Sequence, residues 1–130
     1  MILLDTHVVI WMLLEPERLS SEARRRMSEA VERGDTLGCS VLSLYEIVYA
    51  IRRGRLRLLT SLDEFLRQVQ KRLIVLPVSA KTAITGGQLR DAMHGDPMDG
   101  LIAATALERK CTLITADERI RQAQVCATLW

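Results

Sequence analysis

The acidic residues that could do chemistry stand just after apolar runs or at the starts of expected helices; they are Asp5, Glu46, Asp99 and Asp117. Asp5 directly follows the apolar run of residues 1–4, and Asp117 follows the run of residues 111–115 by two positions. Asp99 falls in the first turn of a helix that Pro97 can open, since proline has no N–H to satisfy there. Taken singly, each acid is better explained as a helix N-cap, as a residue that balances the helix dipole or as a solvated helix position.

The chemistry would come from the acids acting together. Carboxylates gathered at one place repel one another, which raises their pKa values and destabilises the empty site. A hard cation such as Mg²⁺ or Mn²⁺ neutralises such a cluster, accepts oxygen ligands and keeps several waters. Such a cation activates water and stabilises the charge that develops on a phosphodiester under attack. The four acids therefore indicate a Mg²⁺ or Mn²⁺ site.

No other catalytic pattern competes with the acids. The sequence contains no GxSxG, GxxxxGK[ST], HExxH or GxGxxG pattern. Its two histidines and three cysteines show no zinc-binding spacing.

The elements that must position the acids alternate between short apolar runs and helical patterns. Strands are predicted at residues 1–4, 36–39, 73–76, 111–115 and, at the C-terminal end, 125–130. Helices are predicted at residues 7–14, 20–33, 40–53, 61–72 and 79–91, after Asp99, and briefly after Asp117. This alternation predicts an α/β fold with three layers, in which helices cover both faces of a parallel sheet of about five strands. Carboxyl ends of parallel strands meet at one edge, so the acids are expected to gather there.

Length and composition fit one globular domain spanning residues 1–130. No apolar run approaches the roughly 20 residues that cross a bilayer, and the apolar start lacks the basic residues of a signal peptide. We therefore expect a cytoplasmic protein. The net charge of +2 is too small to indicate nucleic acid by itself. Arginines do cluster at residues 24–26 and 52–57, and each cluster is either a solvated helix face or a phosphate contact.

Four segments together resemble the motifs of PIN-domain ribonucleases, and more narrowly of the VapC-type toxins of toxin–antitoxin pairs. They are LLDTH at residues 3–7, SLYEI at 43–47, HGDPMDGLIAA at 94–104 and LITADER at 113–119. Each motif is weak alone, but their order and spacing match and cover essentially the whole chain.

The resemblance implies roles for individual residues. Asp5 and Asp99 would be direct metal ligands, and Glu46 and Asp117 would complete the catalytic site directly or through water. Thr6 and Thr115 match positions where a small hydroxyl residue supports the site, and Asp96 matches an acid that forms the turn before proline. Two residues depart from the family pattern, which usually has phenylalanine at Met98 and arginine at Gly100. Glycine at position 100 is expected to loosen the first turn of its helix but to leave the metal site intact.

The favoured function is a metal-dependent endoribonuclease that cleaves RNA and acts as the toxin of a toxin–antitoxin module. The resemblance also implies a homodimer and a cognate VapB-type antitoxin, whose C-terminal segment would occupy a groove. Leu42, Tyr45 and Tyr49 are expected to help form that groove, or else to pack in the core or in the dimer interface. The alternative function is a catalytically silent RNA- or protein-binding domain of the same fold. Haloacid-dehalogenase and receiver-type phosphoacceptor sites are disfavoured, because histidine stands two residues after Asp5 and proline follows the third strand.

Overall fold

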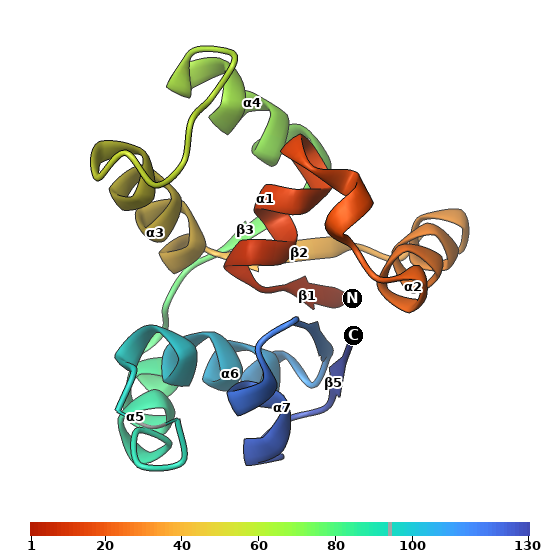
Figure 1. Cartoon of the computed structure of the whole chain (residues 1–130). Coiled ribbons are helices and arrows are strands. Elements are labelled where there is room, and N and C mark those ends of the chain that lie inside the picture. The colour runs from red at the N-terminus through yellow and green to blue at the C-terminus, as the bar shows by residue number, and fades with distance from the viewer. Residues whose placement is uncertain (94) are drawn as a thin grey trace.

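The computed structural model describes residues 1–93 and 95–130. His94, the first residue of the HGDPMDGLIAA motif, lies outside the described residues. Five parallel strands form one sheet in the order β3-β2-β1-β4-β5. The strands are β1 (Ile2–Leu4), β2 (Leu37–Ser40), β3 (Ile74–Leu76), β4 (Thr112–Ile114) and β5 (Thr128–Leu129). The predicted parallel sheet is confirmed (Figure 1).

Helices cover both faces of this sheet, as predicted. They are α1 (Thr6–Leu14), the short 3₁₀ helix η1 (Pro16–Arg18), α2 (Ser21–Glu32), α3 (Val41–Arg52), α4 (Leu62–Arg72), α5 (Ala80–Gln88), α6 (Pro97–Arg109) and α7 (Glu118–Ala123). In Figure 1, α1 to α4 lie on one side of the sheet and α5 to α7 on the other. The helix predicted at residues 79–91 ends earlier, at Gln88, and the chain continues through turns.

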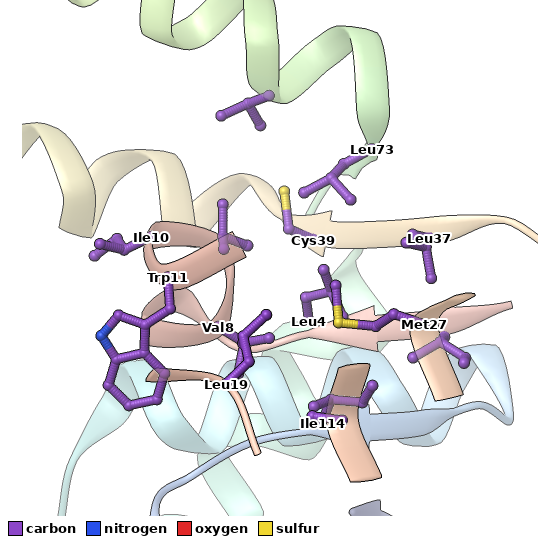
Figure 2. Close-up of a cluster of buried hydrophobic side chains, with 14 of the residues drawn as sticks. Leu4, Val8, Ile10, Trp11, Leu19, Met27, Leu37, Cys39, Leu73 and Ile114 are labelled. Atoms are coloured by element: carbon purple, nitrogen blue, oxygen red, sulfur yellow. The ribbon is translucent and has the colours of Figure 1, made fainter. Parts of the chain in front are cut away.

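The two faces are built from alternating residues of the same strands. Ile2 and Leu4 of β1 belong to the cluster beneath α1 to α4, whereas Leu3 belongs to the cluster beneath α5 to α7. Figure 2 shows the first cluster, in which Leu4, Leu37, Cys39 and Ile114 of the sheet meet Val8, Trp11 and Met27 of the helices. Because both faces of the sheet are covered at β1, this central strand is a continuous apolar run without polar alternation. Each fully buried large side chain contributes roughly 1.5–3 kcal/mol.

Side-chain oxygens begin most of the helices. Ser20, Ser40, Ser61 and Ser79 each accept a hydrogen bond from a backbone N–H in the first turn of the following helix. Each such cap is worth about 1 kcal/mol. Asp5, Asp96 and Asp117 cap α1, α6 and α7 in the same way. The caps fix where each helix leaves the sheet, and so fix the side chains of its first turns.

The helices α5 and α6 approach closely at two glycines. A Cβ atom on Gly100 would lie 3.0 Å from the carbonyl oxygen of Gly86, and a Cβ on Gly86 would lie 2.7 Å from Leu101 Cδ2. Gly100 is buried in this contact. The glycine at position 100, which departs from the family pattern, therefore permits close packing of α6 on α5.

The strand order creates a switch point between β1 and β4. From β1 the chain moves outward to β2 and β3, then crosses to β4 on the other side of β1 and continues to β5. The helices that follow β1 and β4 cover opposite faces of the sheet (Figure 1). In open parallel sheets, ligands bind at the carboxyl ends of the strands where the connections reverse in this way. The register pairs Leu4 with Ile114, so Asp5 and Thr115 emerge side by side.

Within the described part of the chain, no helix is long and apolar enough to cross a membrane.

Candidate acidic site at the carboxyl edge of the sheet

Asp5 directly follows β1 at the carboxyl edge of the sheet and is only 4% exposed. The backbone N–H of Thr6 donates a hydrogen bond to Asp5 Oδ1 at 2.7 Å, and the hydroxyl of Thr115 donates to Asp5 Oδ2 at 2.7 Å. Burial raises the pKa of this carboxyl, although these two hydrogen bonds partly oppose the rise. Asp5 is thus an N-cap, one of the alternatives that the sequence allowed, and also a buried carboxyl with both oxygens held in place.

Glu46 reaches the same region from α3. The hydroxyl of Thr6 donates a hydrogen bond to Glu46 Oε2, and Thr6 Oγ1 also lies 3.0 Å from Ser43 Oγ. Burial raises the pKa of Glu46, and the negative charges of Asp5 and Asp96 raise it further. Glu46 is therefore a half-buried member of the acidic group rather than a solvated helix residue.

Asp99 occupies the first turn of α6, which Asp96 caps. Asp96 Oδ1 accepts hydrogen bonds from the N–H groups of Met98 and Asp99, at 2.9 and 3.5 Å. Burial, together with the negative charges of Asp96, Asp5 and Asp117, raises the pKa of Asp99 to about 7. Asp96 thus has the turn-forming place that the resemblance implied, and Asp99 is not itself the N-cap.

Asp117 has a different environment. Its Oδ1 caps α7, and its Oδ2 lies 3.2 Å from a guanidinium nitrogen of Arg119. Burial favours the neutral form of this carboxyl, but the hydrogen bonds from Arg119 outweigh that effect and lower its pKa. Asp117 is tied to the site through Thr115, whose Oγ1 accepts the Asp117 N–H at 3.0 Å.

The structure therefore places all four predicted acids at one edge, with Asp5 in the middle. Asp5 and Asp117 are among the charges that raise the pKa of Asp99, and Asp5 is among those that raise the pKa of Glu46. Thr6 and Thr115 bridge them: Thr6 joins Asp5 to Glu46, and Thr115 joins Asp5 to Asp117.

The donor set consists of carboxylate and hydroxyl oxygens, which suits a hard cation. Across residues 1–93 and 95–130, no three His, Cys, Asp or Glu side chains converge closely enough to enclose a metal ion. An open set fits Mg²⁺, which keeps several waters and uses one or two carboxylates together with substrate phosphate. It does not fit the closed shell of a structural zinc site.

A cavity of about 590 Å³ extends from the acidic edge along α1 and α3. Thr6, Glu46 and Asp96 line it at the acidic end, and the remaining lining includes Ile10, Trp11, Tyr45, Tyr49, Arg55 and Met98. Tyr45 and Tyr49 thus border the groove, as the sequence suggested, while Leu42 is not among the residues that line it.

Two residues of the site were not singled out from the sequence. Ser43 is fully buried beside Thr6, and its position three residues before Glu46 places both on one helix face. Arg119 neutralises Asp117, and its position two residues after that acid was the available signal. Neither spacing is distinctive enough to have been recognised alone.

Comparisons with known proteins agree with the motifs. A family model described as PIN domain matches residues 2–125. The chain is 34% identical over 120 residues to Ribonuclease VapC22 of Mycobacterium tuberculosis (strain ATCC 25618 / H37Rv). These 120 residues cover 92% of this chain and 89% of that protein.

Solved structures show the same fold. One is VapBC2 from Rickettsia felis bound to a DNA fragment from its promoter, with a TM-score of 0.74, 19% identity and coverage of 99% of this chain and 98% of that one. Another is DNA-bound VapBC from Salmonella typhimurium, with a TM-score of 0.68, 22% identity and coverage of 98% and 96%. With its motifs, its sheet order and its sequence relatives in agreement, this chain belongs to the PIN domain family.

Proposed function

We propose that this protein is a Mg²⁺- or Mn²⁺-dependent endoribonuclease and the toxin of a toxin–antitoxin pair. The observation that carries the proposal is the buried carboxyl of Asp5, whose two oxygens accept hydrogen bonds from Thr6 and Thr115. The carboxyl groups of Asp99 and Asp117 lie close enough to interact with it electrostatically. The 34% identity to a protein named as a ribonuclease supports the choice of RNA as substrate. We expect the protein to act in the cytoplasm.

The chain's own residues would share the work as follows. Asp5 and Asp99 would hold the cation, and Glu46 and Asp117 would complete the site directly or through water. When bound, the cation supplies Lewis-acid chemistry that activates water and offsets charge on the phosphate. Thr6 and Thr115 would keep Asp5 oriented, and Asp96 would fix the start of α6 and hence the place of Asp99.

The environment of Asp99 determines the protonation state of its carboxyl group. Because its pKa is about 7, this carboxyl is partly protonated at neutral pH in the metal-free protein. Asp99 would have to lose that proton in order to hold the cation, so cation affinity should rise as pH increases through 7. Hydrolysis would then join a water oxygen to phosphorus and release the leaving oxygen of the RNA chain with a proton.

The partners belong to the same proposal. A cognate VapB-type antitoxin would place a segment in the cavity lined by Trp11, Tyr45 and Tyr49 and so cover the acidic edge. The apolar rings of this lining support a peptide occupant. We also expect a homodimer, which sedimentation of the purified chain would establish.

The test is incubation of a mixed structured RNA with the purified chain in Mg²⁺, in Mn²⁺ and in EDTA, beside Asp5→Asn. We expect internal cuts that need the cation and vanish in Asp5→Asn. An exposed acid supplies the control: Asp91→Asn should cut as the unmodified chain does. Cutting that persists in EDTA, or in Asp5→Asn, would refute the assignment. Binding of RNA without cutting under any condition would favour the silent binding domain instead.

A further inference from the structure

An aromatic and basic surface runs along α3 away from the acidic edge. Tyr45 and Tyr49, one turn apart, have nearly parallel rings, with an interplanar angle of 6° and centroids 6.2 Å apart. The guanidinium carbon of Arg53 lies 5.5 Å from the centre of the Tyr49 ring. Tyr45 is 58% exposed and Tyr49 45% exposed, so neither ring belongs to the core. We call Tyr45, Tyr49 and Arg53 the α3 platform.

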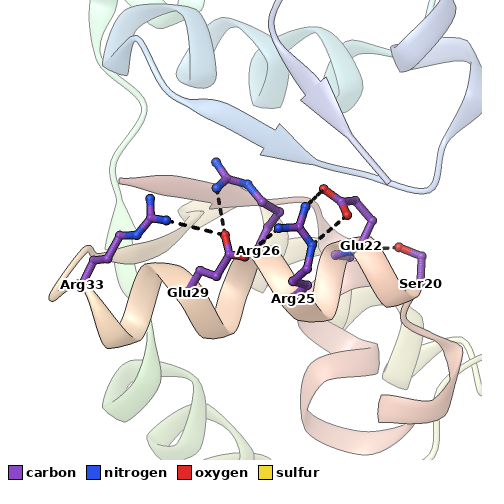
Figure 3. A network of polar contacts seen from close by, with 7 residues as sticks. Ser20, Glu22, Arg25, Arg26, Glu29 and Arg33 are labelled. Carbon is purple, nitrogen blue, oxygen red and sulfur yellow. Dashed lines mark hydrogen bonds and ion pairs between the residues drawn. The ribbon is translucent and has the colours of Figure 1, made fainter.

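The arginines around the platform differ from those of α2. On α2, Arg25 lies 2.6 Å from both Glu22 and Glu29, and Arg26 lies 3.2 Å from Glu29 (Figure 3). Arg25 and Arg26 are therefore neutralised by glutamates of their own helix, as on a solvated helix face, which was one of the two alternatives that the sequence allowed. By contrast, no carboxylate of the described residues lies within ion-pair distance of Arg52, Arg53 or Arg55, all of which are exposed. Positive charge is therefore left uncompensated beside the two tyrosines.

The platform is continuous with the acidic site. Tyr45 and Tyr49 line the same cavity as Glu46, Thr6 and Asp96, and Glu46 lies on the same helix. A second hollow, lined by Tyr45, Val48, Tyr49, Arg52 and Arg53, continues along the helix. From Tyr45 to Arg53 the helix rises about 12 Å, the length of roughly three stacked nucleotides at about 3.4 Å each.

We propose that Tyr45 and Tyr49 stack on unpaired bases of the substrate RNA while Arg53 and its neighbours contact the adjoining phosphates. This proposal rests on the proposed nuclease function and names its substrate class as single-stranded or looped RNA. Exposed aromatic rings combined with arginines are the usual means of holding single strands without sequence readout. Bases inside an A-form duplex are already stacked and cannot reach such rings. The α3 platform thus selects unpaired RNA next to the acidic edge.

The test measures binding without cleavage. A fluorescein-labelled single-stranded oligoribonucleotide and the same strand annealed into a duplex are titrated in EDTA, and binding is followed by anisotropy. We expect Tyr45→Leu and Tyr49→Leu each to weaken single-strand binding by between about fivefold and a hundredfold, as loss of one stacking contact does. Tyr45→Phe and Tyr49→Phe keep the ring and should stay within twofold. Duplex binding should not respond to any of the four substitutions.

A matched pair of arginine substitutions distinguishes a local contact of Arg53 with RNA from a general effect of removing one positive charge. Arg53→Gln should weaken single-strand binding, whereas Arg25→Gln, which removes the same charge from the neutralised α2 cluster, should not. A 2-aminopurine base in the single strand should be quenched on binding to the unmodified chain, and less so by the Tyr49→Leu variant.

Several outcomes would overturn the proposal. Leucine variants that bind single strands as tightly as the phenylalanine variants would exclude stacking. Dissociation of a dimer by the tyrosine-to-leucine substitutions, with binding of RNA unchanged, would make the face an interface between copies of the chain. Ring-dependent binding in EDTA, combined with no cleavage in the separate assays with Mg²⁺ and with Mn²⁺, would uphold the platform and refute the nuclease. Cation-dependent cleavage with an unchanged KM in the leucine variants would refute the platform alone.

Discussion

Asp5 is held by two threonines that are 109 positions apart in the chain, since Thr6 follows it directly and Thr115 follows the last residue of β4. The parallel pairing of β1 with β4 brings them together. An ordinary buried carboxyl would be destabilising unless its oxygens were satisfied. Both oxygens of Asp5 accept hydrogen bonds, which explains how the fold tolerates a buried acid at this point.

Replacement of Thr115 by valine tests this arrangement. Thr115→Val removes the donor to Asp5 Oδ2 and the acceptor of the Asp117 N–H while keeping the side-chain shape. We expect a loss of about 1–3 kcal/mol in the free energy of unfolding, because two polar groups lose their partner. Urea unfolding measures it. Thr115→Ser keeps the hydroxyl and serves as the control; equal stability of the two variants would show that these hydrogen bonds contribute little.

The raised pKa of Asp99 predicts how the stability of the metal-free protein depends on pH. Its folded-state pKa of about 7 exceeds its ordinary value of 3.8, so between these pH values the folded state binds more protons than the unfolded state. The free energy of unfolding of the metal-free protein should therefore fall as pH rises through this window. In EDTA at pH 8, Asp99→Asn should be more stable than the unmodified chain, by roughly 1 kcal/mol after allowance for solvent screening.

The measurement is urea unfolding at pH 5 and at pH 8. The stability gain of Asp99→Asn should be larger at pH 8, and the exposed Asp91→Asn should show no such difference. Loss of stability in Asp99→Asn at both pH values would instead identify Asp99 as a residue that supports the first turn of α6.

At the scale of elements, two neighbouring glycines of α5 differ in their surroundings: Gly86 faces α6, whereas Gly87 faces open space. A methyl group at Gly86 would meet Leu101 Cδ2 at 2.7 Å and Leu101 Cα at 3.1 Å, so α6 would have to move. A methyl group at Gly87, the next residue, would meet nothing within 4 Å. The two positions share a helix and differ only in the direction they face.

Substitutions by alanine should therefore have opposite signs. Gly86→Ala should cost about 1–3 kcal/mol through overpacking. Gly87→Ala should stabilise by roughly 0.5–1 kcal/mol, because alanine is the better helix former. Thermal or urea unfolding distinguishes them. If Gly86→Ala also stabilised the protein, the helices would not be in the close contact described above. A shift of α6 would move Asp99, so Gly86→Ala should also reduce cleavage.

For the whole molecule, the alternation of apolar runs and helical patterns was enough to predict a parallel sheet covered on both faces. The serine and aspartate caps could be read to within a few residues, because a capping side chain acts on its own neighbours. The strand order, with β4 beside β1, could not be read in this way, because pairing depends on contacts between distant segments. It is this order that places Thr115 next to Asp5.

The same distinction applies to the site. Asp5 and Asp117 were predictable as acids that follow strands, and Asp99 as an acid in a first helical turn. The pairing of Asp117 with Arg119 and the burial of Ser43 against Thr6 depend on side-chain direction, which a sequence pattern does not fix. The packing role of Gly100 likewise involves Gly86, a residue of another helix.

The central claim is that the acidic edge binds a divalent cation, and calorimetric titration with Mn²⁺ in the absence of RNA tests it most directly. The unmodified chain and Asp91→Asn should bind Mn²⁺ alike at pH 8, whereas Asp5→Asn and Asp99→Asn should each weaken binding at least about tenfold, as loss of a charged ligand does. Affinity of the unmodified chain should fall when the titration is repeated at pH 6, because the proton on Asp99 competes. Mn²⁺ binding that both aspartate substitutions leave unchanged would contradict the account.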